Sequence, residues 1–393
     1  MTPGIVTLTL AYVLSQFFRA FLAVLTPVLG RDLGVTPDDL ARASGLWFLT
    51  FAIMQIPIGW ALDTLGPRRT AGWLLLVGGG GGATLFALGT TALHIDIAMA
   101  LIGVGCAPVL MASYYIFARD FRPARFAALA SLIVGIGSLG NLVAAYPTAW
   151  AAEQLGWRGT LWGLSAITSL IALATLTLVR DPVKAHAEAT GSLIELLRLR
   201  VLWLIYPLIF VSYAMPGAVR GLWIGPYLSE VFDASVAQIG TATLCMGLAM
   251  VAGVLAYGPA DRRAASRKSL IIAGTGLTLG CAALLIALPG QGLWLSVALM
   301  CGVGFFGATY PVLIAHGRSF LPQHLIGRGV TLLNLCAIGG VGLLQMASGR
   351  LFAATAGAGA APLEAYRAVF LLLAVCLAMG LLLYLFSRDS AKA

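Results

Sequence analysis

Charged side chains are scarce in this sequence, and their scarcity points to its class. Asp, Glu, Lys and Arg make up 10% of the 393 residues, whereas hydrophobic residues make up 60%. Soluble proteins carry about 25% charged residues, so this chain lacks the polar surface that a water-facing globule needs. The same figures exclude a disordered chain, a coiled coil and a small disulfide scaffold. We therefore predict an all-α membrane protein.

Motifs of several chemistries are also absent. The six cysteines show no C-x-x-C spacing, so neither a zinc site nor a disulfide framework is indicated. The sequence has no Walker motif for ATP and no grouping of Ser, His and Asp that indicates catalysis. We expect no enzyme activity, no cofactor and no bound metal. The formal net charge is +9, but basic residues in so apolar a chain orient loops, so no nucleic-acid partner is expected.

Apolar runs separated by polar breaks predict twelve transmembrane helices. Each run is close to the roughly 20 residues that a spanning helix needs. Twelve such helices use about 240 to 280 residues, which leaves short loops in this chain. The runs lie near residues 5–29, 43–62, 71–91, 95–117, 126–150, 158–179, 201–228, 236–257, 269–288, 292–316, 326–349 and 365–386.

Basic residues are unevenly distributed between the predicted loops. Most of them lie in the loops that follow even-numbered helices, and few lie in the loops that follow odd-numbered helices. An excess of Lys and Arg marks the cytoplasmic side of a membrane protein. We therefore expect a multi-pass protein of a bacterial-type inner (plasma) membrane, with both termini cytoplasmic.

The two halves of the chain repeat each other. Pro27 and Pro226, like Gly59 and Gly258, recur at an offset of about 199 residues. Two further motifs recur in the same order, Gly103-x-Gly105 with Gly302-x-Gly304 and Phe121-x-Pro123 with Phe320-x-Pro322. We predict two pseudo-symmetric six-helix bundles, residues 1–180 and 201–393, joined by a cytoplasmic linker of residues 181–200.

The loop after the second predicted helix carries the most specific motif. It reads Gly59-Trp60-Ala61-Leu62-Asp63-Thr64-Leu65-Gly66-Pro67-Arg68-Arg69, which resembles the G-x-L-a-D-r-x-G-r-[RK] motif of the major facilitator superfamily. The chain resembles that superfamily over its whole length. The resemblance implies secondary transport of a small molecule by alternating access. It also implies a cytoplasmic gate formed by Gly59, Asp63, Gly66, Arg68 and Arg69, with Asp261 and Arg262 in a degenerate second copy.

Two arginines fall inside predicted helices, whereas no acidic residue falls in the middle of one. Arg19 lies in the first helix and Arg220 in the seventh. An arginine at the bilayer centre costs about 2.5 to 3.5 kcal/mol, so each should face a water-filled path or a partner. We predict that both face a central cavity and bind the negative group of a small organic anion.

Other residues are candidate substrate ligands beside these arginines. Helical spacing places Tyr12 and Gln16 on the face of Arg19. It places Tyr213, Trp223 and Tyr227 on the face of Arg220, and Pro216-Gly217 is a point where that helix can break and expose backbone groups. Further polar residues of the predicted spans are added as candidates to line the path: Tyr114, Asn141, Tyr310 and Asn334.

Two alternatives stay open from the sequence alone. Met246 and Met250 are one turn apart near Cys245, with Met215 on the preceding helix. Because thioethers select copper(I), one alternative is an importer of copper or another soft metal. The other alternative is a non-transporting membrane receptor or assembly factor on the same scaffold. In each case the partners are the lipid bilayer and a small molecule, and we expect a monomer.

Overall fold

A computed structural model describes residues 2–182, 195–196, 198–264, 266–288, 290–322 and 326–389. Throughout these ranges the regular structure is helical, without strands. Ten of the described helices are long and apolar enough to cross a membrane, and one bent helix pair makes an eleventh span. A shorter apolar stretch, Leu129–Val143, belongs to a further helix. The predicted all-α fold with about twelve spans is therefore confirmed.

The described residues of the first half form nine α-helices and one π-helical segment. In chain order these are α1 (Pro3–Phe17), α2 (Phe21–Leu33), α3 (Pro37–Thr64), α4 (Pro67–Leu74), η1 (Leu75–Gly80, π-helical), α5 (Gly81–Leu88), α6 (Ala92–Cys106), α7 (Pro108–Asp120), α8 (Pro123–Val143) and α9 (Tyr146–Leu178). Within α9, Gly156 has φ 71° and ψ 161° and turns the chain. Residues 157–178 therefore form the predicted sixth helix.

The described elements of the second half follow the same plan. They are η2 (Arg200–Leu204), α11 (Tyr206–Ser212), α12 (Ala214–Ala218), η3 (Val219–Trp223, π-helical), α13 (Ile224–Phe232), α14 (Val236–Arg263), α15 (Arg267–Ala287), α16 (Leu293–Phe306), α17 (Tyr310–Arg318), α18 (Ile326–Gly357) and α19 (Pro362–Leu385). Several spans of both halves are interrupted. The sequence did not indicate most of these breaks, because local hydrophobicity continues through them.

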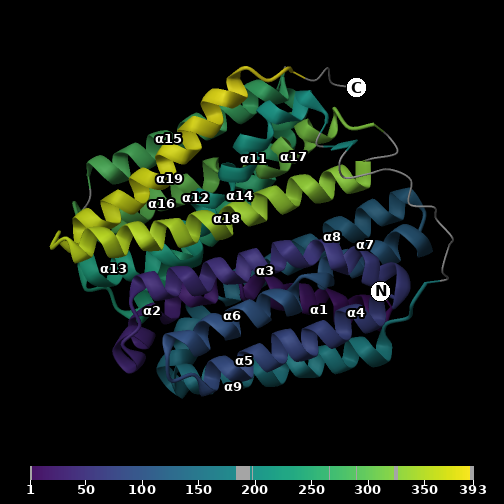
Figure 1. Cartoon of the computed structure of the whole chain (residues 1–393), viewed down its shortest axis with the longest axis horizontal. Helices are drawn as coiled ribbons and strands as arrows, with labels where there is room; N and C mark the ends of the chain where they lie inside the picture. Colours follow the sequence, from purple (N-terminus) through teal and green to yellow (C-terminus); the bar gives the residue numbers. More distant parts are fainter. Residues whose placement is uncertain are drawn as a thin grey trace. The chain divides into compact units, whose positions relative to one another are not determined.

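Two compact units make up the molecule. Unit 1 comprises Met1–His186 with Ser235–Thr241, and unit 2 comprises Ala187–Ala234 with Ala242–Ala393. In unit 1, α3 lies along α6 and α5 along α9, and in unit 2, α18 lies along α19 (Figure 1). Most of the predicted 181–200 linker lies outside the described residues, so its boundaries stay a prediction.

Helix starts in this protein follow local rules. Proline occupies one of the first two positions of α1, α3, α4, α7, α8 and α19, where its missing N–H has no intrahelical partner to lose. Thr36 caps α3 by accepting a hydrogen bond from the Asp39 amide at 3.2 Å. The Asp39 carboxylate accepts one from the Thr36 amide at 3.0 Å in return. This capping box begins α3 six residues before the predicted start at residue 43.

Close helix packing in both units depends on glycine. A Cβ atom on Gly78 would lie 2.6 Å from the backbone nitrogen of Gly105, so η1 and α6 meet backbone to backbone. In unit 2, a Cβ atom on Gly340 would collide with the carbonyl oxygen of Phe210, which brings α18 onto α11. Small residues allow this approach where lipid surrounds the helices.

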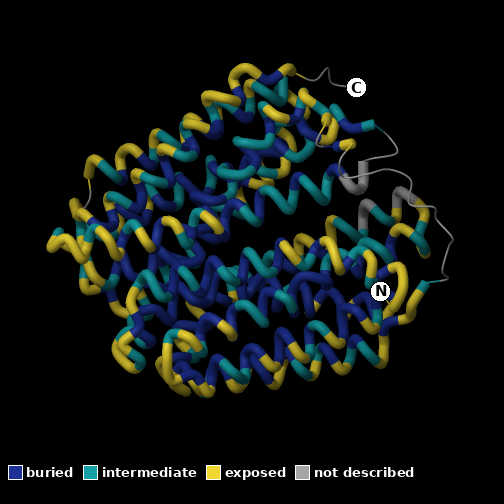
Figure 2. The backbone as a smooth tube through the Cα atoms, viewed as in Figure 1, coloured by how far each residue is buried: buried dark blue, intermediate teal, exposed yellow. Residues whose placement is uncertain are grey.

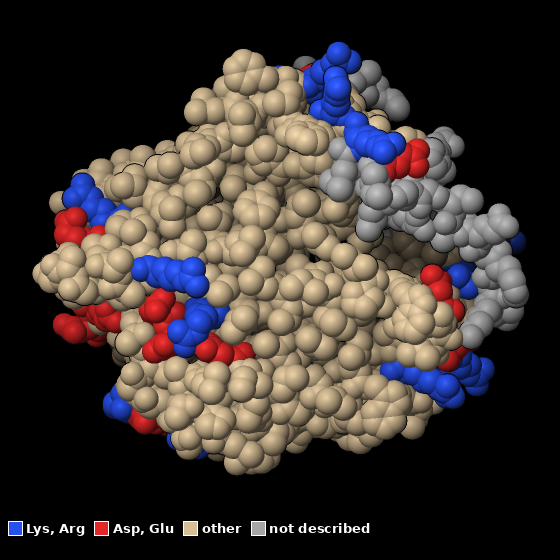
Figure 3. Space-filling model, viewed as in Figure 1, with Lys and Arg blue, Asp and Glu red and all other residues tan. Residues whose placement is uncertain are grey.

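Apolar side chains cover much of the outside of each unit. Leu170 is 69% exposed and Leu255 is 70% exposed, and the burial-coloured trace shows exposed positions recurring along α9 and α19 (Figure 2). On the visible face, Lys, Arg, Asp and Glu gather toward the helix ends and leave an uncharged surface between them (Figure 3). Such a surface suits contact with lipid and not with water.

Candidate functional site

Arg19 lies at a break in the first span and not inside a continuous helix. Helix α1 ends at Phe17 and α2 begins at Phe21, and the two helices bend by 49°. Upstream of the break, Gln16 Nε2 donates to Tyr12 Oη at 3.0 Å, so these two candidates share a face as predicted. The simple helical register does not extend to Arg19, because the chain leaves the α-helix after Phe17.

Two aromatic rings of α3 hold the Arg19 guanidinium. Its Cζ lies 5.0 Å from the ring centre of Phe51 and 5.4 Å from that of Trp47. Its Nε is buried without a hydrogen-bond partner, and no carboxylate within the described ranges forms an ion pair with it. Each cation–π contact contributes about 0.5 to 2 kcal/mol. This is less than the cost of inserting an arginine at the centre of the bilayer, which is about 2.5 to 3.5 kcal/mol.

The seventh span changes its helical type twice. Tyr213 separates α11 from α12, and η3 widens into a π-helix that contains Arg220, which is 3% exposed. The predicted break at Pro216-Gly217 is wrong, because both residues lie inside α12. Pro216 is the third residue of that helix, where an amide has no intrahelical partner, so the proline is tolerated. Single π-turns occur frequently at functional sites.

Three predicted ligands come together in unit 2. The rings of Tyr213 and Tyr310 lie 5.5 Å apart between centres. The Tyr310 hydroxyl donates a hydrogen bond to Asn334 Oδ1. One aromatic and polar group thereby joins the seventh, tenth and eleventh spans. Their contact with a substrate stays a prediction.

Trp223 and Tyr227 lie deep in unit 2. Trp223 Nε1 donates to Ser348 Oγ at 3.0 Å, and the Tyr227 hydroxyl lies 3.2 Å from Ser296 Oγ. Both rings pack on Tyr366. These contacts attach the seventh span to α16, α18 and α19, so both side chains have packing roles that the sequence did not reveal.

The remaining unit 1 candidates lie on α7 and α8. The ring centre of Tyr114 is 5.9 Å from that of Phe126. A Cβ atom on Gly137 would collide with the ring of Tyr12, which shows how closely α8 follows α1. Asn141 lies one turn further along α8. The candidates Tyr12, Tyr114 and Asn141 therefore belong to helices that pack on one another.

The loop motif predicted as a gate is held by charges of its own unit. Asp63 lies 3.5 Å from Arg119, whose guanidinium also sits 4.2 Å from the ring centre of Tyr115. The backbone amide of Arg68 donates to Asp181 Oδ1 at 2.8 Å, and Arg68 Nε is 3.6 Å from Asp181 Oδ2. A carboxylate at a helix N-terminus is favourable, so Asp181 caps α4.

Gly66 and Gly59 of this motif differ in what their positions require. Gly66 has φ 87°, and a Cβ atom on it would meet the Asp181 carboxylate at 2.8 Å, so only glycine fits there. Gly59 has open space around it, and nothing in the structure explains it. Arg69 is exposed. Neither Asp181 nor Arg119 was predicted at this site, although Arg119 is one of the basic residues that follow an even-numbered predicted helix and Asp181 comes directly after another, Arg180.

An ion pair connects the two helices at the second copy of the motif. Asp261, near the end of α14, lies 3.2 Å from Arg267 at the start of α15. Arg262 is exposed. Nearby, Lys268 Nζ donates to the carbonyl oxygens of Leu385 and Ser387, both at 2.7 Å, and so caps the end of α19. The function of both motif copies as a gate stays a prediction.

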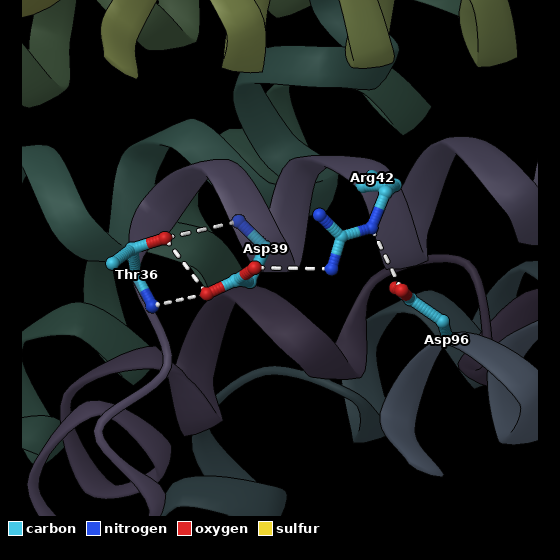
Figure 4. Close-up of polar contacts among 4 residues, drawn as sticks. All are labelled: Thr36, Asp39, Arg42 and Asp96. Atoms are coloured by element: carbon cyan, nitrogen blue, oxygen red, sulfur yellow. Dashed lines mark hydrogen bonds and ion pairs between the residues drawn. The ribbon is translucent and has the colours of Figure 1, made fainter. Parts of the chain in front are cut away.

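A charged cluster at the other end of unit 1 was not predicted. Arg42 Nε donates to Asp96 Oδ2 at 2.7 Å, and its Nη2 donates to Asp39 Oδ1 at 3.0 Å (Figure 4). Asp96 belongs to α6 and is 7% exposed. Arg42 comes directly before the apolar run of residues 43–62, so hydrophobicity alone places it in a loop. The guanidinium therefore ties the start of α3 to α6.

The methionine pair packs helices together. Met246 and Met250 of α14 surround Gly304 of α16, where a Cβ atom would meet Met250 Cγ at 2.9 Å and Met246 Cγ at 3.4 Å. Met215 is buried, and Cys245 is partly exposed. No group of three His, Cys, Asp or Glu side chains suited to a metal occurs in the described residues. The methionine side chains therefore pack α14 against α16, and this arrangement does not favour the copper alternative.

Comparison with known proteins identifies the class. Residues 8–344 match the family model of the Major Facilitator Superfamily. A bacterial homolog to the human lysosomal transporter Spinster, in an inward-facing and occupied conformation, superposes with a TM-score of 0.78 at 16% identity, over 98% of this chain and 96% of that one. The chain therefore belongs to the major facilitator superfamily, and it is a membrane transporter and not an enzyme.

Two curated relatives match over only part of the chain. The 4-hydroxybenzoate transporter PcaK of Pseudomonas putida is 26% identical over 190 residues, which is 48% of this chain and 41% of that protein. A gallate transporter of Pseudomonas putida is 29% identical over 143 residues, which is 34% of this chain and 31% of that protein. The matches thus span less than half the length of either relative.

Proposed function

We propose that this transporter carries a small organic anion by alternating access, and that Arg19 binds the negative group. The observation that carries the proposal is the environment of the Arg19 guanidinium. Its guanidinium lies at the bend between α1 and α2, against Phe51 and Trp47, and forms no ion pair within the described part of the chain. A planar guanidinium held against two rings is well suited to bind a carboxylate through two parallel hydrogen bonds.

The names of two relatives narrow the substrate class. 4-Hydroxybenzoate and gallate are both benzoates that carry hydroxyl groups on the ring. We propose that the substrate of this chain is an aromatic carboxylate of that kind. Arg220 adds a second positive charge in the seventh span, and Tyr213 and Tyr310 add aromatic surface in the same unit.

The proposal includes an orientation in the membrane. The loops rich in basic residues, including the one that holds Arg68 and Arg69, are assigned to the cytoplasm of a bacterial-type cell. Both termini then lie on that side, and the Arg42 cluster lies on the opposite side. We also propose that a monomer performs transport, because one superfamily chain carries both repeats of the fold.

The experiment is substrate uptake by the full-length purified protein in proteoliposomes. Labelled 4-hydroxybenzoate should accumulate, and unlabelled benzoates should compete for its uptake. Benzamide and a neutral sugar serve as uncharged controls and should not compete. Uptake that benzamide inhibits as well as benzoate would contradict the anion assignment. A complete lack of flux for every aromatic acid would contradict the substrate class.

A further inference from the structure

One buried amide in unit 2 has no hydrogen bonds. Gln345 of α18 is 0% exposed, and neither Nε2 nor Oε1 has a partner within the described ranges. The other buried glutamines differ from it. Gln16 donates to Tyr12 Oη at 3.0 Å, and Gln55 donates to the Phe51 carbonyl oxygen at 3.1 Å. A buried amide without partners is unfavourable, so its persistence requires an explanation.

Gln345 lies on α18 between two residues that contact the seventh span. A Cβ atom on Gly217 would meet Val341 Cγ1 at 3.5 Å, and Ser348 Oγ accepts a hydrogen bond from Trp223 Nε1 at 3.0 Å. Val341, Gln345 and Ser348 are spaced four and three residues apart, so they share one face of α18. Gln345 therefore lies on the face of α18 that packs on the stretch between Gly217 and Trp223, which contains the π-turn η3.

The chemistry of the amide selects the kind of group that it can bind. An amide offers N–H donors and a carbonyl acceptor side by side, and a hydroxyl group is both an acceptor and a donor. A carboxylate only accepts, so it would leave Oε1 without a partner. Because both amide atoms are unpaired, exchanging the nitrogen and oxygen positions leaves this reasoning unchanged.

We propose that Gln345 binds a ring hydroxyl group of the substrate and so selects hydroxylated benzoates over benzoate. This inference rests on the proposed function, which assigns the substrate to the hydroxylated benzoates. A site built to hydrogen-bond a hydroxyl group rejects an analogue without it, because its own buried polar atoms are then left unpaired. Gln345 is thus a specificity-determining residue for the hydroxyl group.

The test compares two competitors in proteoliposomes that contain the full-length protein. Uptake of labelled 4-hydroxybenzoate is measured against unlabelled 4-hydroxybenzoate and unlabelled benzoate, and the ratio of their inhibition constants is the readout. The wild type should prefer the hydroxylated compound by about tenfold or more, the factor that corresponds to 1.4 kcal/mol. Gln345→Leu should bring the ratio close to one while benzoate still competes.

A matched control separates recognition from folding. Gln55→Leu removes a buried amide whose donor bonds are made within unit 1, so it should keep the wild-type ratio even where the uptake rate falls. If Gln345→Leu does not elute as a folded protein, Gln345→Met replaces it, because the flexible methionine side chain adapts to irregular space. An unchanged ratio in the folded Gln345 variant overturns the inference.

The wild-type result alone distinguishes the two levels of the proposal. Transport of 4-hydroxybenzoate and benzoate with equal inhibition constants overturns the role of Gln345 and leaves the anion transporter standing. No transport of either compound, and no inhibition by either, overturns the proposed function itself. A preference that Gln345→Leu removes and Gln55→Leu keeps supports both.

Discussion

Replacing Arg19 by glutamine should separate substrate binding from stability. A hydrogen bond to a charged group contributes about 1.5 to 3 kcal/mol, and every 1.4 kcal/mol corresponds to a factor of ten. Arg19→Gln should therefore weaken binding of 4-hydroxybenzoate about 10- to 100-fold. Arg19→Lys keeps the charge but loses the planar pair of donors. Its affinity should therefore lie between that of the wild type and that of Arg19→Gln.

The same substitution should leave the fold intact. It removes contacts with Phe51 and Trp47 that are worth about 0.5 to 2 kcal/mol each. It also removes a charge whose insertion into the bilayer costs about 2.5 to 3.5 kcal/mol. Since the two effects oppose each other, the melting temperature should stay near that of the wild type while affinity falls.

Equilibrium binding of labelled 4-hydroxybenzoate by purified protein measures the affinity, and a thermal melt of the same sample measures stability. Arg158→Gln is the matched control. Arg158 also contacts a tryptophan, because its Cζ lies 4.1 Å from the ring centre of Trp157. Its guanidinium donates a hydrogen bond to the Gly89 carbonyl oxygen at 3.0 Å. It lies at the end of a span, so its replacement should leave affinity unchanged. Folded Arg19→Gln protein with wild-type affinity would refute the assignment of Arg19 as the anion ligand.

Three further predictions concern stability, each read from thermal melts of the purified protein. Gly105→Val should lower the melting temperature strongly, because overpacking costs about 1 to 3 kcal/mol or more where η1 meets α6, and an unchanged melt would contradict the close contact. Asp181→Ala should cost about 0.5 to 2 kcal/mol as the loss of a helix cap and leave the Arg68 amide without its carboxylate, whereas Asp181→Asn should recover part of that loss. Asp96→Asn should cost about 1 to 3 kcal/mol, because the buried partner of Arg42 then loses its charge, and an effect below about 0.5 kcal/mol would mean that the pair behaves as an exposed one.

Local sequence predicted much of this fold for a physical reason. A bilayer requires about 20 apolar residues in each span, so the spans can be read from hydrophobicity alone. The repeat of Gly59 and Pro27 at Gly258 and Pro226 required only a comparison of the chain with itself. Errors arose where polar residues belong to helices, as in the capped start of α3 at Thr36.

The candidate site was predicted less well, because the hydrophobic pattern of the sequence continues through the helical interruptions and does not indicate them. Pro216-Gly217 looked like a break, yet the chain deviates from the α-helix at Tyr213 and again around Arg220. Tyr213, Tyr310 and Asn334 were named from polarity, and the structure shows that they meet. Gln345 has no local signal, because its unpaired state depends on every neighbour that surrounds it.

The sequence by itself determined that this chain crosses a membrane many times, in two alike halves, with two arginines in apolar surroundings. These properties follow from composition and periodicity along the chain, because each spanning helix satisfies its backbone hydrogen bonds within its own segment. Only the tertiary structure decided which charges meet. Arg68 and Asp181 are separated by 113 residues, and Arg42 and Asp96 by 54. Such pairs depend on how helices pack, because contact between distant residues is a property of the folded bundle and not of either segment alone.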